Sequence, residues 1–288
     1  MNTETPSSVL ETQPARVSST SPVFRACNLC GNANPEHLWE RNGYSIVACR
    51  RCGLQYVGQD PRDIDFAALY SESYYTGGDG QVFADYVGEE RVRRASARRR
   101  LRSMRRRTAG SGRLLDVGCA AGFFLAEAGR YFEPHGVEIS GFASRVAREK
   151  FGLDVFTGTL QDAKFAAASF DVVTMWDVVE HLADPKAVLT EVARLLRPGG
   201  SLVLTTGDVG SRYARLAGPR WHLLEPPWHL YFFSRATMSA MGAAAGLRLK
   251  ACTSTGVASD LRIVRSLPVR VAANFLGLGD IMEMTLTK

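Results

Sequence analysis

A strand that leads into a glycine turn is the feature that most constrains this chain. Three of the four residues 114–117 are apolar, and they run into the small residues between Gly118 and Gly122 before a helix start. Such a turn lets the backbone press against a ligand and presents the N–H groups of a helix N-terminus. A second short strand ends at Glu138, 22 positions after Asp116, where doubly wound α/β domains place the carboxylate that binds a ribose diol. The pattern therefore predicts a nucleoside-bearing cofactor.

The spacing within the turn narrows the choice of cofactor. Gly118-x-Ala120-x-Gly122 differs from the G-x-G-x-x-G of dinucleotide-binding folds, and Asp116 at the strand end would repel a pyrophosphate. The segment resembles the first motif, D-x-G-x-G-x-G, of the class I S-adenosylmethionine-dependent methyltransferases, with Ala120 in place of the middle glycine. An ordinary glycine-rich strand-to-helix turn is the alternative interpretation.

Later segments follow in the order of that family's fold. Phe170–Trp176 has the pattern of a buried strand, and Asp184 with Pro185 supplies an N-cap and a first-turn proline for a helix. Arg197–Gly200 predicts the end of that helix, and Ser201–Thr206 the next strand. The resemblance implies an α/β fold, a Rossmann-like seven-stranded methyltransferase domain.

Four cysteines near the N-terminus form a separate motif. Cys27-x-x-Cys30 and Cys49-x-x-Cys52 have the spacing of a four-thiolate zinc ribbon, and a glycine after each second cysteine allows a tight turn. We expect structural Zn2+ with no open position, although iron suits the same ligands. A pair of disulfides is the alternative and would need an oxidising compartment, whereas residues 1–22 lack the apolar core of a signal peptide.

The remaining regions complete the expected organisation. Residues 247–253 and 281–286 alternate as late strands, and residues 257–277 have the pattern of one or two short amphipathic helices. We expect a disordered tail over residues 1–22, a zinc ribbon over 23–59, a helical bridge over 60–110 and the methyltransferase domain over 111–288, which is the part that the resemblance covers.

The resemblance also assigns a binding site for S-adenosylmethionine. Gly118 and Gly122 would let the backbone approach the ligand, Asp116 would orient its amino group, and Glu138 would bind both ribose hydroxyls. An equal alternative for the capping residue Tyr75 is core packing. The full predicted cofactor set is Tyr75, Asp116, Gly118, Gly122, Glu138, Ile139, Leu160 and Trp176.

Two histidines are candidates for a catalytic base. A sulfonium methyl group is already electrophilic, so the enzyme has to hold the acceptor in line and, for a hydroxyl or an acidic carbon, to remove a proton. His181 follows the strand 170–176, and His229 lies in a segment rich in proline and aromatic residues, 225–233. The resemblance supports a substrate-facing role for that segment. For either histidine, the alternative is a buried structural role.

Charge leaves a second kind of partner open. The net charge is +6, and ten arginines fall between Arg91 and Arg107, so a polybasic helix could bind the phosphates of a nucleic acid. A solvated helix face is the favoured interpretation. The exit of the strand 170–176, Asp177–Glu180, also lacks the Asn/Asp-Pro-Pro-aromatic turn with which enzymes of this class methylate nucleobase amines.

These observations predict an S-adenosylmethionine-dependent methyltransferase that acts on a small-molecule acceptor, at oxygen or carbon, in secondary or cofactor metabolism. An RNA or protein methyltransferase and a non-catalytic scaffold are the alternatives. No run of eighteen apolar residues occurs, so we expect a cytoplasmic protein without a membrane span. The sequence leaves the acceptor and the oligomeric state open.

Overall fold

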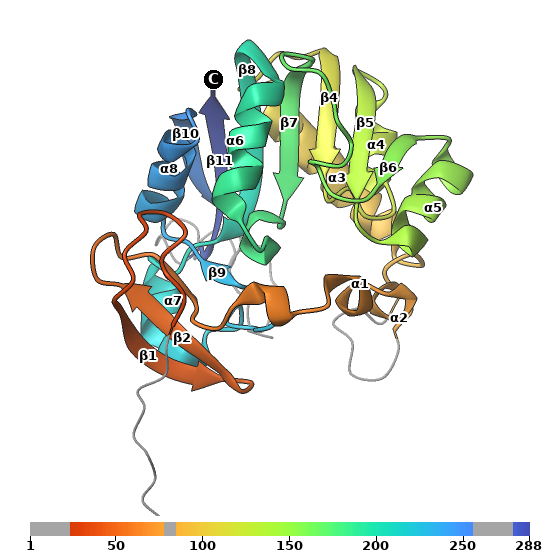
Figure 1. The fold of residues 1–288 in the computed structure, drawn as a ribbon. Coiled ribbons are helices and arrows are strands. Elements are labelled where there is room, and N and C mark those ends of the chain that lie inside the picture. The colour runs from red at the N-terminus through yellow and green to blue at the C-terminus, as the bar shows by residue number, and fades with distance from the viewer. Residues whose placement is uncertain (1–23, 78–84, 256–278) are drawn as a thin grey trace, which may run out of the picture.

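The computed structural model describes residues 24–77, 85–255 and 279–288, and it contains two sheets. The predicted tail over residues 1–22 and the predicted helices over residues 257–277 lie outside the described residues. Figure 1 shows the large sheet with β1 and β2 of the small sheet, and the helices α1 and α2, below the ends of its central strands.

The large sheet has seven strands in the order β10-β11-β8-β7-β4-β5-β6. The pairs from β8 across to β6 are parallel, and β11 is antiparallel to both of its neighbours. This mixed sheet confirms the predicted Rossmann-like α/β fold. Its strands are β4 (Gly112–Val117), β5 (Phe132–Glu138), β6 (Asp154–Thr157), β7 (Phe170–Trp176), β8 (Leu196–Gly207), β10 (Arg248–Thr255) and β11 (Ile281–Thr287).

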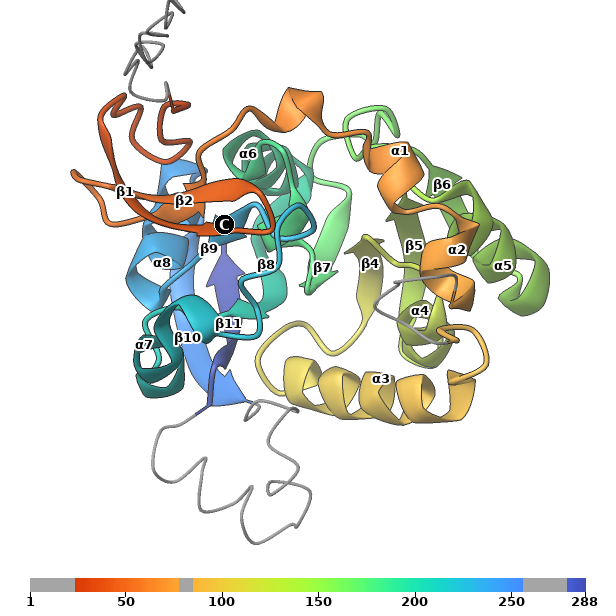
Figure 2. The ribbon, with the colours of Figure 1, turned by 90° about the horizontal axis from the view of Figure 1, so that it is seen from below.

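Helices cover both faces of this sheet. Helices α6 and α8 contact each other on one face, and α3 and α4 pack together on the other (Figure 2). All residues of β7 except Asp171 are buried, as expected for a central parallel strand covered on both sides. The helices are α3 (Glu90–Arg105), α4 (Phe123–Ala128), α5 (Gly141–Phe151), α6 (Pro185–Leu195) and α8 (Arg235–Ala244).

The start of β8 differs from the prediction. Helix α6 ends at Leu195, but Arg197–Gly200 forms the first part of the strand instead of a turn that precedes it. The pairing of β7 with β8 shifts register between Phe170 and Val172, and Gly199 takes the left-handed conformation with φ +78°. This irregularity inserts extra residues into one strand without ending the ladder.

The small sheet joins two regions that lie far apart in the sequence. Its order is β1-β2-β3-β9, where β1 (Pro35–Arg41), β2 (Tyr44–Cys49) and β3 (Gln55–Val57) follow one another, and β9 (Tyr231–Phe232) comes from the region between β8 and α8. Gln55 pairs with Phe232 and Tyr56 with Tyr231. No sequence pattern predicted this pairing. The pairing of β3 with β9 attaches the region that contains the four cysteines directly to the segment that contains His229.

Helices α1, α2 and α3 lie between the small sheet and the large one along the chain. Two short helices, α1 (Phe66–Leu69) and α2 (Glu72–Thr76), follow β3. The arginine-rich helix α3 then buries one apolar stripe, formed by Ala97, Leu101 and Met104, while each of its arginines stays at least partly exposed. No helix in the described parts of the chain is long and apolar enough to cross a membrane.

Candidate active site

A cavity of about 700 Å³ opens at the carboxyl ends of β4, β5 and β7. Ligands bind at this edge in open α/β sheets, and the walls here come from α1, α2, α3 and the segment 223–229 as well. Eight of the ten residues predicted to contact cofactor or acceptor line it, namely Tyr75, Gly118, Glu138, Ile139, Leu160, Trp176, His181 and His229. Asp116 and Gly122 are not part of the lining.

The glycine turn has steric reasons for its composition. Gly118 has φ +71°, and a Cβ atom on it would lie 2.6 Å from Val178 Cγ2. Gly122 has φ +79° as the N-cap of α4, and a Cβ there would lie 2.6 Å from Leu153 Cδ1. Ala120, which replaces the middle glycine of the motif, also has a positive φ, +49°. Gly118 thus lets the turn form the cavity floor, and Gly122 serves packing beneath it.

Glu138 is prepared to accept hydrogen bonds from a ligand. Its two carboxylate oxygens accept from the backbone N–H groups of Ala120 and Ser140, each at 2.8 Å, and the Tyr75 hydroxyl donates to it as well. Burial raises the pKa of Glu138, while these donors oppose the shift. The backbone donors leave one acceptor position on each carboxylate oxygen, so a ribose diol could fill both positions by taking the place of the Tyr75 hydroxyl.

Asp116 lies below the turn. It is 2% exposed, and its Oδ1 accepts a hydrogen bond from the Thr174 hydroxyl at 2.7 Å. Burial raises its pKa to about 7. Asp116 therefore does not line the cavity. Any effect of Asp116 on a ligand would be electrostatic and would act across the glycine turn.

Arg100 and Trp176 form one side of the cavity. The Arg100 guanidinium lies 4.9 Å from the centre of the Trp176 ring and forms an ion pair of 2.6 Å with Asp177. From the sequence, Arg100 was predicted only as one member of the arginine cluster. Arg100 lies three residues after Ala97 and four before Met104, so it is on the side of α3 that carries the buried stripe. This spacing is the signal that could have identified Arg100 as a cavity residue.

A group of aromatic rings forms part of the cavity wall. Tyr74 packs edge-to-face against both Tyr70 and Tyr75 at centroid distances of 5.1 Å, and Tyr75 packs against Tyr86 at 5.4 Å. All four tyrosines line the cavity. The predictions included Tyr75 as a cap but did not foresee this continuous aromatic surface, because three of the rings come from short helices with no clear periodicity.

The two candidate histidines lie side by side, with ring centroids 4.7 Å apart. His181, in the short 3-10 turn Val179–His181, has Nδ1 at 2.8 Å from the Trp228 carbonyl oxygen and 2.9 Å from the Tyr70 hydroxyl. His229 has Nδ1 at 2.7 Å from the Leu223 carbonyl oxygen. Because a carbonyl only accepts, each Nδ1 carries its proton, and the lone pair of the neutral ring is on Nε2.

Burial keeps both rings neutral. It lowers the pKa of His181 to about 3, with a smaller contribution from His229, and it also lowers the pKa of His229. Both histidines therefore make the structural bond to a backbone carbonyl and also face the cavity with an unprotonated nitrogen. Such a nitrogen can accept a proton or bind a metal ion.

Glu180 adds a carboxyl group to the same cluster. It is 6% exposed, its Oε2 has no hydrogen-bond partner among the described residues, and burial and then the charge of Asp177 raise its pKa to about 8. One donor atom from each of Glu180, His181 and His229 lies within 4.8 Å of the others. One carboxylate and two neutral imidazoles are a donor set that could hold a divalent metal ion.

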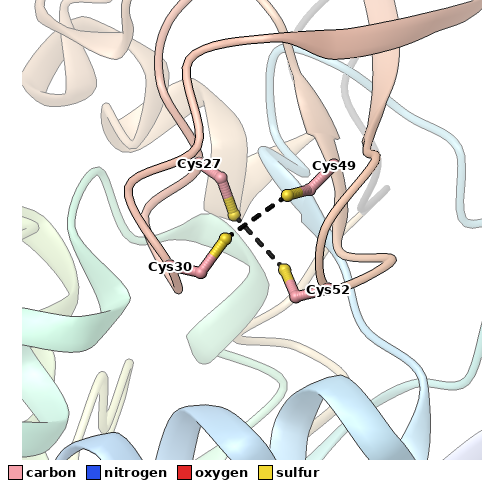
Figure 3. A group of neighbouring side chains, drawn as sticks. All are labelled: Cys27, Cys30, Cys49 and Cys52. Atoms are coloured by element: carbon pink, nitrogen blue, oxygen red, sulfur yellow. Dashed lines mark hydrogen bonds between the residues drawn. The ribbon is translucent and has the colours of Figure 1, made fainter.

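The four cysteines form a compact cluster beside the small sheet, where β2 ends at Cys49, with their sulfurs pointing toward one centre (Figure 3). Cys27 Sγ lies 3.6 Å from Cys52 Sγ, and Cys30 Sγ lies 3.4 Å from Cys49 Sγ. These distances exceed the roughly 2.05 Å of a disulfide bond, and they approach the ~3.8 Å that a tetrahedron with Zn–S bonds of about 2.3 Å requires. The donor set fits a tetrahedral zinc ion.

The local backbone supports a thiolate at Cys49, whereas burial raises the pKa of Cys27 and of Cys52. Gly31 and Gly53, which follow the second cysteine of each pair, have φ +73° and +75°. Burial opposes ionisation of Cys49, but N–H groups of the turn Arg51–Cys52 and the neighbouring thiols lower its pKa to about 6. The predicted turn geometry is thus present, with backbone donors directed at sulfur.

The fold and site together define a cofactor-binding α/β enzyme domain with a cysteine cluster attached. Residues 87–251 match the family model described as a methyltransferase domain. The chain therefore belongs to the methyltransferase domain family.

Curated relatives and solved structures agree with this family. The chain is 38% identical over 104 residues to a ubiquinone biosynthesis O-methyltransferase of Cereibacter sphaeroides, which covers 33% of this chain and 40% of that protein. It is 33% identical over 154 residues to the enzyme of the same name from Thiobacillus denitrificans, covering 49% and 66%. The matches thus span less than two thirds of either relative.

Two solved structures share the fold. An S-adenosylmethionine-dependent methyltransferase from Archaeoglobus fulgidus has a TM-score of 0.54 at 19% identity, over 70% of this chain and 99% of that one. Another from Thermotoga maritima has a TM-score of 0.53 at 23% identity, over 70% and 94%. At these identities the likeness concerns the fold alone.

Proposed function

We propose that this protein is an S-adenosylmethionine-dependent methyltransferase that acts on a small molecule, at oxygen or carbon. The observation that carries the proposal is that one cavity is lined both by the Glu138 carboxylate and by the neutral histidine pair. The curated relatives are named as O-methyltransferases of ubiquinone biosynthesis, which supports a role in cofactor metabolism and transfer to oxygen.

The cofactor half of the cavity would be formed by the predicted residues. Glu138 would bind the ribose hydroxyls, Ile139 and Leu160 would enclose the adenine, and Gly118 would bring its backbone against the methionine part. Ile139 is 42% exposed and Leu160 is buried. One face of the adenine would therefore contact a weakly packed side chain, and the other face a tightly packed one. Bound S-adenosylmethionine supplies a methyl group on a positively charged sulfur.

The acceptor half would lie next to the histidines, with Tyr70 and Tyr74 in its wall, since Tyr75 donates to Glu138 in the cofactor half. Aromatic walls suit a planar acceptor, which they would hold with its hydroxyl toward the histidines. His229 Nε2 would take the hydroxyl proton, since its ring is neutral and its Nδ1–H is anchored on the Leu223 carbonyl. His181 would position His229 through ring contact. If Glu180, His181 and His229 bound a metal ion, the same histidine nitrogens would be metal ligands instead of proton acceptors. Measuring whether turnover depends on added metal would distinguish these two roles.

The cysteine cluster would hold structural zinc through Cys27, Cys30, Cys49 and Cys52, with all four positions of the metal filled by protein. A cytoplasmic location, where thiols stay reduced, agrees with a thiolate site and remains a prediction. The domain division expected from the sequence is retained as part of this proposal.

The arginine cluster gives no reason to prefer a macromolecular substrate. Among the described residues, five of its ten arginines take part in ion pairs: Arg93, Arg94, Arg98, Arg100 and Arg107. Glu127 alone receives two of them, Arg94 at 2.7 Å and Arg98 at 3.0 Å. Arginines in these ion pairs are already neutralised by carboxylates, so they are less available to bind the phosphates of a nucleic acid.

Isothermal titration with S-adenosylmethionine and with S-adenosylhomocysteine tests the proposal. We expect both to bind the zinc-loaded protein with micromolar affinity, on the order of 8 kcal/mol. A screen of phenolic acceptors would then identify the substrate. Absence of binding by either ligand would contradict the proposal and favour a non-catalytic scaffold.

A further inference from the structure

The cysteine module, residues 24–59, is bonded to the segment 223–232 that carries His229. Besides the pairing of β3 with β9, Val57 donates its backbone N–H to the Leu230 carbonyl at 2.9 Å. From the β1–β2 hairpin, Arg41 Nε donates to the Leu224 carbonyl at 3.2 Å, and Asn42 Nδ2 to the Pro226 carbonyl at 3.0 Å. The module therefore holds this segment at both ends, on either side of Trp228 and His229.

The same module also contacts the second histidine's side of the cavity. Asn28, between Cys27 and Cys30, donates to Asp184 Oδ1 at 2.9 Å and accepts from the backbone N–H of Lys186 at 3.1 Å. Asp184 lines the cavity and caps α6, three residues after His181. A turn that bends around the metal site is thus bonded to the start of α6.

A third set of contacts closes the assembly. The Arg25 guanidinium donates to the Tyr231 hydroxyl at 3.0 Å, and that hydroxyl donates to the Ala183 carbonyl at 3.1 Å. Leu230 donates its backbone N–H to the Glu180 carbonyl at 2.8 Å. Segments 180–184 and 223–232, which present the two histidines, are therefore joined to each other and to the cysteine module.

The cofactor half has different supports. Glu138 is held by Ala120, Ser140 and Tyr75, and the glycine turn by the Val137 carbonyl, which accepts from Gly118 N–H at 2.8 Å. None of these residues belongs to the module. Order in the cofactor half thus depends on β4, β5 and α2.

We propose that metal binding by the four cysteines orders the acceptor half of the active site and leaves cofactor binding independent of the metal. The inference rests on the proposed function for the identity of the two halves. A module of this size has too small a core of its own to stay folded without the metal, so removal of the metal would release segment 223–232 from β3. The histidines would then lose their fixed positions while the Glu138 pocket persisted.

Hydrogen exchange on the full-length protein, zinc-loaded and after chelation, tests this directly. We expect backbone amides of residues 223–232 to exchange about tenfold faster after chelation, and those of residues 112–122 to keep their protection. Affinity for S-adenosylhomocysteine should change less than about twofold, and re-addition of zinc should restore the protection.

Variants in which all four cysteines are kept can distinguish coupling between the cysteine module and the acceptor half from simple unfolding of the module. Asn28→Ala and Arg41→Ala remove bonds from the module to the acceptor half, and both should raise acceptor KM with cofactor affinity unchanged. Asn34→Ala and Arg50→Ala are matched controls in the same module. Among the described residues, Arg50 pairs with Glu36, at 3.8 Å, and Asn34 bonds to Asn32 through its backbone N–H and carbonyl groups, so neither side chain reaches the acceptor half. Both controls should behave as the unaltered protein.

Two results would overturn the inference. Unchanged exchange of residues 223–232 after chelation would show that the metal does not order this segment, and a parallel loss of cofactor affinity would show that it stabilises the whole chain instead. If the zinc-loaded protein binds no S-adenosylhomocysteine, the proposed function fails, and the exchange of residues 223–232 alone then decides whether the metal orders them.

Discussion

At the scale of single residues, Glu138 offers the sharpest test of the cofactor site. Replacement by alanine removes a buried carboxylate that could bind two hydroxyls, so Glu138→Ala should weaken S-adenosylmethionine binding by about 1–3 kcal/mol. Titration calorimetry measures this change. Glu133→Ala, on the same strand but exposed, serves as the control. Equal affinities of Glu138→Ala and the unaltered protein would remove Glu138 from the ribose site.

His229 can be tested through turnover and its pH dependence. His229→Ala should lower kcat strongly and leave cofactor affinity unchanged, because His229 lies in the acceptor half. Burial lowers the pKa of His229 below its ordinary value of 6.5, so the ring stays neutral and basic to lower pH. The acid limb of the kcat profile should therefore lie below pH 6.5. Turnover of His229→Ala equal to that of the unaltered protein would end its candidacy, and His37→Ala, in the cysteine module, is the control.

Asp116 links stability to pH. Its pKa rises from an ordinary 3.8 to about 7 on folding, because it is buried. Between these values the folded protein binds more protons than the unfolded chain, so this group's contribution to the free energy of unfolding is greatest below pH 4 and is lost as pH rises through about 7. Asp116→Asn should flatten this decline, as measured by denaturant titration without cofactor. A decline of equal slope in the variant would assign the effect to other groups, such as Glu180.

At the scale of elements, Gly122 in the turn before α4 can be compared with Gly141 at the start of α5. A Cβ on Gly122 would require a left-handed backbone and would lie 2.9 Å from Ala147 Cβ, whereas one on Gly141 would meet nothing within 4 Å. Gly122→Ala should therefore destabilise the protein by roughly 1–3 kcal/mol, and Gly141→Ala by less than about 0.5 kcal/mol. Thermal unfolding of the two variants measures the difference. Similar stabilities would show that the turn adapts to a side chain.

The elements also show what a sequence can reveal. Strands β4, β7 and β8 follow from apolar runs, and the cysteine turns follow from the spacing of two short motifs, because these signals are local. The pairing of Tyr56 with Tyr231 could not be predicted, since a strand of two residues has no periodicity and its partner lies 175 positions away. The acceptor half of the site depends on that pairing. The residues predicted to bind the cofactor follow consecutive strands of one sheet, and for this reason a local pattern could group them.

At the scale of the whole molecule, one of the two buried hydrophobic clusters of the described residues spans both sheets. It includes Ile46 and Leu54 from the cysteine module, Phe233 after β9, Leu189 from α6 and Leu202 from β8. Apolar side chains of the module and of the large sheet thus pack in one cluster. The module therefore depends on the large sheet for part of its core.

The shared core predicts that the cysteine module and the acceptor segments unfold together. Unfolding of the module exposes Leu230 and Phe233 and removes the partner of β9, so both parts should unfold in one calorimetric transition. The cofactor half has separate supports and should unfold in a later transition. Excess zinc should raise the temperature of the first transition and leave the second unchanged, since the metal binds only the folded module. A single transition that zinc shifts as a whole would show that the metal stabilises the whole chain, and would contradict the independence of the cofactor half.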